Sequence, residues 1–434
     1  MSVDRGLELV EYLKPGGVRR MRRTGTRLAL AGTLALSGVM GAALPVGAQA
    51  PAGCSVFASD LAQPRFLAVG ADNAVYVTEA GSGGSEQIAR PAQLPPQVPA
   101  ASNRGTSGRV TRIAPDGSKR VVASGLPSYA SEMEVGGAGG IAVAGNSLWV
   151  AVGNPGPLTP FVQPLPADGS VHRVDIASGT VTKVVDLGEM ERGSNPDGTL
   201  VDTNLYGLAT APNGTVYVAD AGGNAVYSVN PANGQARVLA TIGGLPSPQP
   251  NPARGGRNEL DPVPTGVTVG VDGNVYVGLL SGAPFPEGAA KVVRITPAGQ
   301  VSDAATGLTA VTGVAMGPDR NLYVSEIFRL DLTAQPPAMR PGRVLRVLAN
   351  GTKQVVAENL NTPNGLAFDR AGNLYIATGS TTPAGQVLRC TAVAGATALP
   401  STGGGLPVAP AAALTAAFTA ALAGAALVRR RGAA

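Results

Sequence analysis

The sequence of 434 residues contains one histidine, two cysteines and few aromatic or charged side chains, whereas glycine and proline are abundant. The single histidine, His172, lies in an expected strand over residues 170–175, where we predict a surface position. One histidine excludes a metal centre built from several imidazoles, and it does not support a histidine-based catalytic triad. Scarce aromatics, many turn-forming residues and frequent Val and Ala favour a turn-rich β protein over a helical one.

The first 50 residues have the pattern of a secretory signal peptide. A basic stretch that ends at Arg27 precedes an apolar run over residues 28–44, and small residues follow at Ala48 and Ala50. Met21 is a candidate for the true start, and Ala48 competes with Ala50 as the cleavage position because Pro51 follows Ala50. A membrane anchor is the alternative, but the apolar run is short for a membrane span.

The C-terminal region, residues 392–434, contains three features in order. They are the pentapeptide Leu399, Pro400, Ser401, Thr402 and Gly403, an apolar stretch that ends at Val428, and the basic residues 429–431. This order resembles the LPxTG sorting signal of Gram-positive surface proteins. The resemblance implies that sortase cleaves after Thr402 and joins the protein to cell-wall peptidoglycan. The alternative is a transmembrane helix that remains in the membrane. Both alternatives place the rest of the chain outside the cell.

The formal net charge of +5 belongs to the two ends of the chain. Residues 1–50 carry seven basic and three acidic side chains, and residues 403–434 carry three basic and no acidic ones. The exported part is therefore slightly acidic, with a charge of about −2. Its charge gives no support to nucleic-acid binding, and we expect no nucleic-acid partner.

Between the two signals, residues 51–391 contain six copies of one pattern. Each copy has two or three apolar residues, a tight turn and an apolar–aromatic–apolar triplet; the copies are Phe66–Val77, Gly140–Val150, Gly207–Val218, Gly266–Val277, Gly313–Val324 and Gly365–Ile376. The pattern is that of a β-hairpin, and a second hairpin follows in most copies. Four strands, A to D, repeated six times predict an all-β, six-bladed β-propeller rather than a linear β-solenoid.

The two ends of the repeat region complement each other in sequence. Residues 54–61 match residues 353–360, the strand D of the fifth unit, while the sixth unit stops at Cys390 without a strand D. We therefore predict that the N-terminal strand completes the sixth blade as a velcro closure. In this alignment Cys54 and Cys390 flank one hairpin, which predicts a disulfide between them. A lipid-modified Cys54 is the alternative, but Pro51 stands where a lipobox has an aliphatic residue.

Extra residues occur mainly between strands B and C and between strand D and the next strand A. These connections emerge on the same face of a propeller, and variable loops on a rigid scaffold commonly carry binding sites. Three carboxylates stand where strand B reaches this face: Glu79, Asp220 and Glu326. Residues before strand A reach the same mouth: Arg65, Asn204, Thr265, Thr312 and Asn364. These are the candidate ligand-binding residues, and the three acids are candidate ligands for Ca²⁺. The alternative is that amides of its own loop bind each acid.

Several segments, taken in order, resemble the ScyD/ScyE family of NHL-like propellers, which is named from the scytonemin biosynthesis locus. They include PRFLA at residues 64–68, SNPDG at 194–198, NLYGL at 204–208, ADAGGN at 219–224 and GAPFPEGAAKVVR at 282–294. The resemblance implies a secreted or periplasmic protein whose activity is poorly defined. Leu279 departs from the acid expected there in relatives, which weakens a shared acidic site.

Two functions follow from the sequence. The first is a non-catalytic propeller on the cell surface that binds an unknown ligand or protein through its loop-rich face. The alternative is a metal-dependent hydrolase or lactonase, because residues 363–366 resemble a segment of the gluconolactonase propellers. No catalytic pair of an acid and a base can be assembled from the sequence, so the binding function is favoured.

Overall fold

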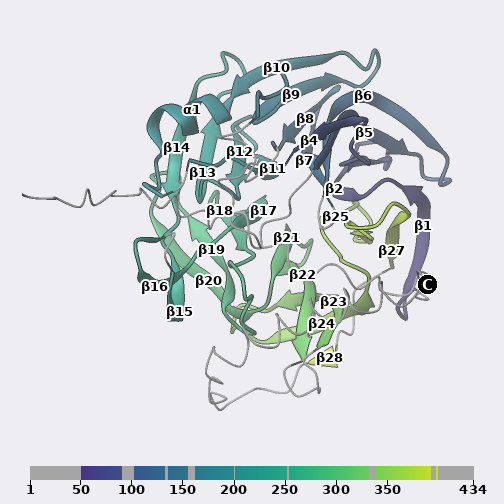
Figure 1. The fold of residues 1–434 in the computed structure, drawn as a ribbon. Coiled ribbons are helices and arrows are strands. Elements are labelled where there is room, and N and C mark those ends of the chain that lie inside the picture. Colours follow the sequence, from purple (N-terminus) through teal and green to yellow (C-terminus); the bar gives the residue numbers. More distant parts are fainter. Residues whose placement is uncertain are drawn as a thin grey trace, which may run out of the picture.

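A computed structural model describes residues 50–89, 102–131, 135–154, 162–199, 201–251, 254–331, 338–391 and 397–398. These residues form an all-β propeller in which short antiparallel sheets surround a common centre (Figure 1). Leu187–Ser194 forms the helix α1. Within the described residues, no helix is long and apolar enough to span a membrane. The predicted signal peptide and the motif from Leu399 to Gly403, with the apolar stretch after it, lie outside the described residues.

The first two repeat units belong to one nine-stranded sheet. Its strands are β2 (Pro64–Val69), β3 (Val75–Glu79), β4 (Glu86–Ile88), β5 (Ser102–Ile113), β6 (Lys119–Ala130), β7 (Val135–Ala144), β8 (Ser147–Val152), β9 (Ser170–Asp175) and β10 (Val181–Asp186). The strands β6 and β7 are long enough to pair with each other beyond their own hairpins, from Ser128–Gly137 to Ala130–Val135. This pairing joins two units that the sequence predicts as separate sheets.

The third and fourth units form separate four-stranded sheets. The third contains β11 (Leu205–Thr210), β12 (Val216–Asp220), β13 (Ala225–Val229) and β14 (Ala236–Thr241). The fourth contains β17 (Pro264–Val269), β18 (Val275–Leu279), β19 (Ala290–Ile295) and β20 (Val301–Leu308). A two-stranded hairpin, β15 (Leu245–Asn251) and β16 (Arg257–Leu260), lies in the connection between these sheets.

The fifth unit and the C-terminal strands complete the fold. The fifth unit contains β21 (Val311–Met316), β22 (Leu322–Asp331), β23 (Ala338–Val347) and β24 (Lys353–Leu360), and β28 (Thr397–Ala398) pairs with its edge. The last sheet contains β25 (Leu366–Phe368), β26 (Leu374–Thr378), β27 (Gly385–Cys390) and the N-terminal strand β1 (Cys54–Leu61).

The described sheets therefore differ from the predicted set of six separate blades. Four sheets of four or five strands stand apart as single blades, and the nine-stranded sheet holds the strands of two predicted units. The difference has a local cause, because the edge pairing of β6 with β7 depends on strand lengths that the repeat pattern does not specify. The all-β propeller fold itself is confirmed.

Glycines at the start of the repeats explain how closely the innermost strands approach. These strands contact in the order β2, β7, β11, β17, β21 and β25, and β25 also contacts β2 (Figure 1). A Cβ atom on Gly207 would lie 2.1 Å from the carbonyl oxygen of Thr265, and one on Gly313 would lie 2.1 Å from that of Asn364. Any side chain at these positions would collide with the backbone of the next unit, so glycine is required.

In the fourth, fifth and sixth units the tyrosine of the triplet is tied to the preceding turn. The hydroxyl of Tyr323 donates to Asp319 at 3.1 Å, and the hydroxyl of Tyr276 donates to Asp272 at 2.9 Å. The same aspartates accept a backbone N–H two residues later, which is the geometry of an Asx turn. The recurring turn and tyrosine in the sequence therefore form one hydrogen-bonded unit at the A–B hairpin.

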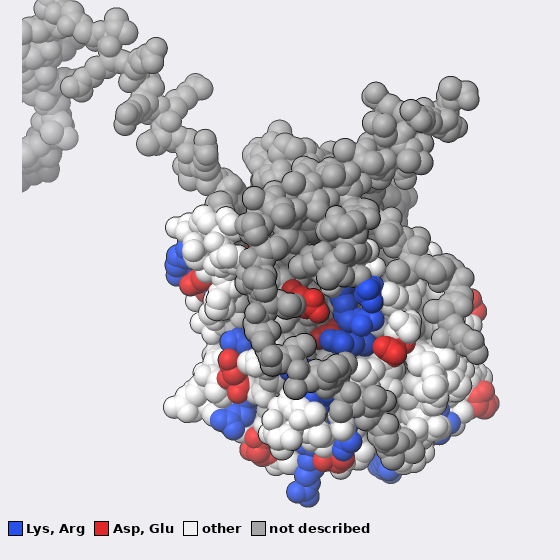
Figure 2. Space-filling view, turned by 90° about the horizontal axis from the view of Figure 1, so that it is seen from below, with Lys and Arg blue, Asp and Glu red and all other residues white. Residues whose placement is uncertain are grey.

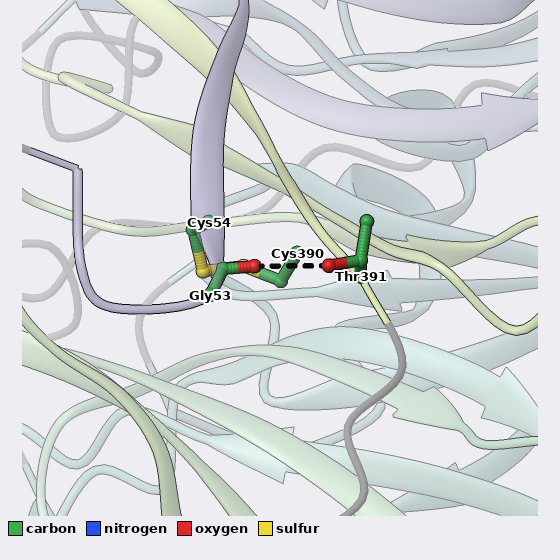
Figure 3. Close-up of a disulfide and its surroundings, with 4 residues drawn as sticks. All are labelled: Gly53, Cys54, Cys390 and Thr391. Atoms are coloured by element: carbon green, nitrogen blue, oxygen red, sulfur yellow. Dashed lines mark hydrogen bonds between the residues drawn. A yellow bond between two sulfur atoms is a disulfide. The ribbon is translucent and has the colours of Figure 1, made fainter.

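The predicted disulfide is present and joins the two ends of the described chain. Cys54 on β1 faces Cys390 on β27, and their S–S bond of 2.02 Å connects positions 336 residues apart (Figure 3). Beside the bond, the backbone N–H of Thr391 donates to the carbonyl oxygen of Gly53 at 3.1 Å. The strand β1 has the same eight-residue length as β24, the strand with which its sequence aligns.

The core lies between neighbouring sheets rather than inside any one of them. For example, Tyr217 and Leu239 of the third unit pack in one cluster with Val277 and Val293 of the fourth. His172 also belongs to the interior, with only 2% of its surface exposed, so the predicted surface position is wrong. Burial lowers the pKa of His172 to about 4, and this imidazole is therefore neutral at pH 7.

Candidate functional site

The three predicted acids occupy equivalent places in three units. Glu79, Asp220 and Glu326 face the first residues of strands β2, β11 and β21, through the pairs Pro64–Glu79, Leu205–Asp220 and Val311–Glu326. Each of these carboxylates is fully buried. Because a buried charge is costly unless it is paired, the partners of each acid decide what it can do.

Glu79 has a complete set of partners from its own unit. Arg109 donates to both carboxylate oxygens, at 2.8 Å from Nε and 2.7 Å from Nη2. The hydroxyl of Thr111 and the backbone N–H of Ala62 also donate to Glu79. Such a two-point ion pair with further donors satisfies the carboxylate and leaves it no role as a metal ligand.

Glu326 repeats this arrangement in the fifth unit. The Nε of Arg343 donates to one oxygen at 2.6 Å, and the backbone N–H of Thr309 donates to the other at 2.8 Å. Burial raises the pKa of Glu326, whereas the adjacent Arg343 guanidinium lowers it. Glu79 and Glu326 therefore tie the connection that precedes strand A of each unit to its strand C.

Asp220 lacks the arginine that the other two acids have. One of its oxygens, Oδ1, accepts from the backbone N–H groups of Asn204, Gly222 and Gly223 at 2.7, 3.2 and 3.0 Å. Burial, with a smaller contribution from the nearby Asp202 carboxylate, raises the pKa of Asp220 to about 7 against the lowering effect of the amide donors. Amides of its own loops hold this acid, as the alternative interpretation of the sequence expects.

The three acids do not come together. They lie in different sheets, each with its own partners. In the part of the chain that the structure describes, no three Asp, Glu, His or Cys side chains already stand in a metal-coordinating arrangement. A Ca²⁺ site formed by Glu79, Asp220 and Glu326 therefore has no geometric support.

The predicted threonines connect neighbouring units. The hydroxyl of Thr265 donates to the carbonyl oxygen of Val311 at 2.8 Å, and that of Thr312 donates to the carbonyl oxygen of Pro363 at 2.9 Å. Both threonines are fully buried. Their hydroxyls link one inner strand to the next, which is a structural role.

Arg65 and Asn364 meet through a tyrosine that the sequence analysis did not single out. Arg65 Nη1 donates to the hydroxyl of Tyr206 at 3.1 Å, and Asn364 Nδ2 donates to the same hydroxyl at 2.7 Å. The Arg65 guanidinium also lies 5.5 Å from the centre of the Tyr206 ring and donates to the carbonyl oxygen of Val135. This Arg65–Tyr206–Asn364 cluster joins three units at the centre of the ring.

Asn204 lies beside this cluster but uses its backbone for a different contact. Its N–H binds Asp220, and its carbonyl oxygen accepts from Ala221 at 2.9 Å. Its side-chain Oδ1 would lie 2.6 Å from a Cβ atom on Gly153, so glycine is needed there to make room for the amide. Asn204 therefore shapes the loop around Asp220 and does not contact Arg65 among the hydrogen bonds of the described residues.

Charged side chains on the surface are mixed rather than separated by sign. Ion pairs such as Lys291–Asp303 at 2.6 Å and Arg112–Asp72 at 2.6 Å place opposite charges next to each other. Figure 2 shows basic and acidic side chains of the described residues side by side on the face seen from below. A groove of about 430 Å³ lies at the turns between the first and last units, lined by Asn73, Pro115, Asp369, Arg370, Ala371, Asn373, Tyr375 and Arg389.

No protein-family model matches the chain. A curated gluconolactonase from Zymomonas mobilis subsp. mobilis is 25% identical over 195 residues, which are 42% of this chain and 51% of the relative. The chain thus matches about half the length of that curated relative.

The chain is also similar to solved structures. Virginiamycin B lyase from Staphylococcus aureus is 13% identical with a TM-score of 0.42, over 76% of this chain and 95% of that chain. A protein of unknown function from Bacteroides thetaiotaomicron is 14% identical with a TM-score of 0.48, over 77% of this chain and 74% of that one. Similarity at this level does not extend to activity or substrate.

Proposed function

We propose that the chain is an exported, surface-anchored propeller of the ScyD/ScyE type that binds a ligand or partner protein through its loop-rich face without catalysing a reaction. The observation that supports this proposal most is the use of Glu79 and Glu326 within their own units. A hydrolase needs carboxylates that can reach a substrate or a metal, and these two are bound to Arg109 and Arg343 instead. The B–C and D–A connections, which leave an antiparallel blade at the same end, contain β4, α1 and the β15–β16 hairpin.

The proposal includes six blades closed by the N-terminal strand. In this proposal the nine-stranded sheet counts as two blades, β2–β3–β5–β6 and β7–β8–β9–β10. The pairing of β1 with β27 supports the velcro closure, as does the hydrogen bond of 2.8 Å from the N–H of Gly365 to the carbonyl oxygen of Arg65. A closed ring would give the loop-rich face a rigid base.

The binding proposal is tested with one bulky substitution on each face. Gln249 is exposed on the β15–β16 hairpin, and Asn213 is exposed at the tight A–B turn of the third unit. We expect Gln249→Trp to reduce retention of the exported protein on purified cell-wall and surface polymers of its host by about tenfold, because most interface energy comes from a few central contacts. The control Asn213→Trp should bind like the parent. Equal retention of both variants, with binding of the parent established, would contradict the loop-face assignment.

The second candidate function is a metal-dependent lactonase, favoured by the similarity to the curated gluconolactonase. Its site would be the Arg65–Tyr206–Asn364 cluster at the centre. A panel of lactones assayed with Ca²⁺, Mg²⁺, Mn²⁺ and Zn²⁺ decides between the two functions. We expect no turnover above that of an Asn364→Leu variant. Turnover by the parent that falls at least tenfold in this variant would replace the binding function with the hydrolase.

Anchoring by sortase is part of the same proposal. The pentapeptide from Leu399 to Gly403 and the basic tail would deliver the exported chain to cell-wall peptidoglycan, and residues 1–50 would direct export. Protein released from the wall by a muramidase should end at Thr402 joined to a wall peptide, as read by mass spectrometry. A mature chain that retains residues 403–434 would show instead that the tail stays in the membrane.

A further inference from the structure

Asp220 belongs to a second group of acids in the connection between the second and third units. Glu191 lies on the helix α1, Asp197 and Asp202 follow it in the loop, and Asp220 ends strand β12. Glu191, Asp202 and Asp220 each expose no more than 1% of their surface. The Tyr227 hydroxyl donates to Glu191 Oε2 at 3.2 Å, which places a phenol at the edge of the group.

Several buried oxygens in this group lack hydrogen-bond donors. Oδ1 of Asp220 takes all three amide N–H groups, and its Oδ2 has no donor among the described residues. Within the same part of the chain, Glu191 Oε1 and the side-chain oxygen of Asn195 also have none. Buried polar atoms without partners are rare in proteins, and each calls for an explanation such as an ion.

Two consecutive glycines, Gly222 and Gly223, lie against the carboxylates of this group, and the donor-free Oδ2 of Asp220 lies beside the second. A Cβ atom on Gly223 would lie 2.9 Å from Glu191 Oε2 and 3.1 Å from Asp220 Oδ2. The two carboxylate oxygens are therefore no more than about 6 Å apart, on either side of the glycine. A Cβ atom on Gly222 would lie 2.9 Å from the carboxyl carbon of Asp202. Three carboxylates thus face the same glycine turn.

The register of strand C explains why this group has no arginine. Glu79 pairs with Arg109 across β3 and β5, and Glu326 pairs with Arg343 across β22 and β23. The equivalent partner of Asp220 is Ala225. In the described part of the chain, the hydrogen bonds of Glu191 and Asp220 come from a tyrosine and from backbone amides, not from Lys or Arg.

The electrostatic consequence is strong mutual repulsion. Burial, together with the nearby carboxylates of Asp220, Asp197 and Asp202, raises the pKa of Glu191 to about 8. Carboxylates this close stay ionised together only when a positive charge joins them. In the units with arginine the chain supplies that charge next to the acid, and here a bound cation would supply it.

We propose that Glu191, Asp202 and Asp220 bind a Ca²⁺ ion at the Gly222–Gly223 turn. Carboxylate oxygens without nitrogen or sulfur are the ligands of a hard cation, and several carboxylates with a flexible loop suit Ca²⁺ better than Mg²⁺. No three of these side chains already stand in coordinating positions, so binding draws them towards the glycine turn. The ion would fix α1 and the following loop against β12, on the loop-rich face.

The test compares two ligand variants with a matched control at the equivalent position of another unit. The exported protein is treated with a chelator and then titrated with Ca²⁺, with binding measured by equilibrium dialysis and thermal unfolding followed in parallel. The parent and Glu79→Gln should bind one ion per chain and gain about 3–5 °C in Tm at about 1 mM Ca²⁺. Glu191→Gln and Asp220→Asn should bind at least tenfold more weakly and lose this gain. In the chelator, Glu191→Gln should be as stable as the parent or more so, because it removes a repelling charge.

A second readout does not depend on the folding of these variants. Tb³⁺ replaces Ca²⁺ at oxygen sites, and Tyr227 lies close enough to sensitise its emission. We expect sensitised emission from the parent that Ca²⁺ displaces, and emission that is severalfold weaker from Tyr227→Phe when both proteins are saturated with Tb³⁺. The proposal would be overturned if the parent does not bind Ca²⁺ at about 1 mM, or if the parent and both ligand variants bind it equally. In either case protons, and not a metal ion, would neutralise these carboxylates.

Discussion

Removal of the Cys54–Cys390 disulfide by substitution of both cysteines with alanine is expected to lower the free energy of unfolding by about 5 kcal/mol. The bond joins residues 336 positions apart, so its loss frees almost the whole propeller chain in the unfolded state. The folded state also loses its tie on β1, a strand that pairs only with β27 in the described sheet. Denaturant unfolding of the oxidised parent and the double variant measures the difference.

A disulfide at the equivalent place in the fifth unit provides the control. Val347 and Lys353 face each other across β23 and β24, as Cys390 and Cys54 do across β27 and β1. Cysteines at Val347 and Lys353, introduced into the double alanine variant, would close a loop of few residues and should restore only about 2 kcal/mol. Equal stabilisation by the two disulfides would show that the bond acts through local strand pairing and not through closure of the chain.

The strands and turns could be predicted well because the hairpins of this fold are local. Residues 54–61 and 353–360 align in sequence, and each segment forms one strand, β1 and β24, with the bounds of the aligned residues. A turn such as Asp319–Asn321 and the tyrosine that follows it specify their own hydrogen bonds. The disulfide was predictable for the same reason, because it occupies one position of a repeated hairpin.

Features that depend on neighbouring units could not be read from the repeats. The pairing of β6 with β7 requires both strands to extend past their hairpins, and it merges two predicted sheets. The burial of His172 depends on the packing of its strand against the segments around it, which one strand does not reveal. The helix α1 lies in a connection where the sequence analysis expected only a loop.

The candidate site shows the same division. The equivalence of Glu79, Asp220 and Glu326 was predicted, but their partners were not. Arg109 and Arg343 stand opposite the acids on strand C in two units, so their pairing could have been inferred from strand register. Tyr206 and Glu191 could not, because each meets its partners across long stretches of chain.

Substitution of Arg343 with methionine is expected to lower the free energy of unfolding by about 3–5 kcal/mol. The carboxylate of Glu326 is fully buried, and without the guanidinium it retains only the N–H of Thr309 among its hydrogen bonds in the described residues. Methionine keeps most of the volume of the arginine stem, so the loss reports on the unpaired charge. Denaturant unfolding at pH 7 measures it.

The pH dependence and a double variant separate the charge from the packing. Burial already raises the pKa of Glu326, and loss of Arg343 removes the cation that opposes this rise. A carboxyl group whose folded pKa lies above its unfolded value destabilises the protein at high pH and ceases to do so as the pH falls towards the unfolded value. The deficit of Arg343→Met should therefore shrink between pH 8 and pH 5, and Glu326→Gln in the same chain should recover most of it at pH 7.

The control is Arg346→Met. Arg346 lies on the same strand as Arg343 and forms a partly exposed ion pair with Asp319, so its loss should cost no more than about 1 kcal/mol. If the stability deficit of Arg343→Met does not change with pH and remains in the double variant, Arg343 acts through packing. Glu326 would then have to be neutral in the parent as well.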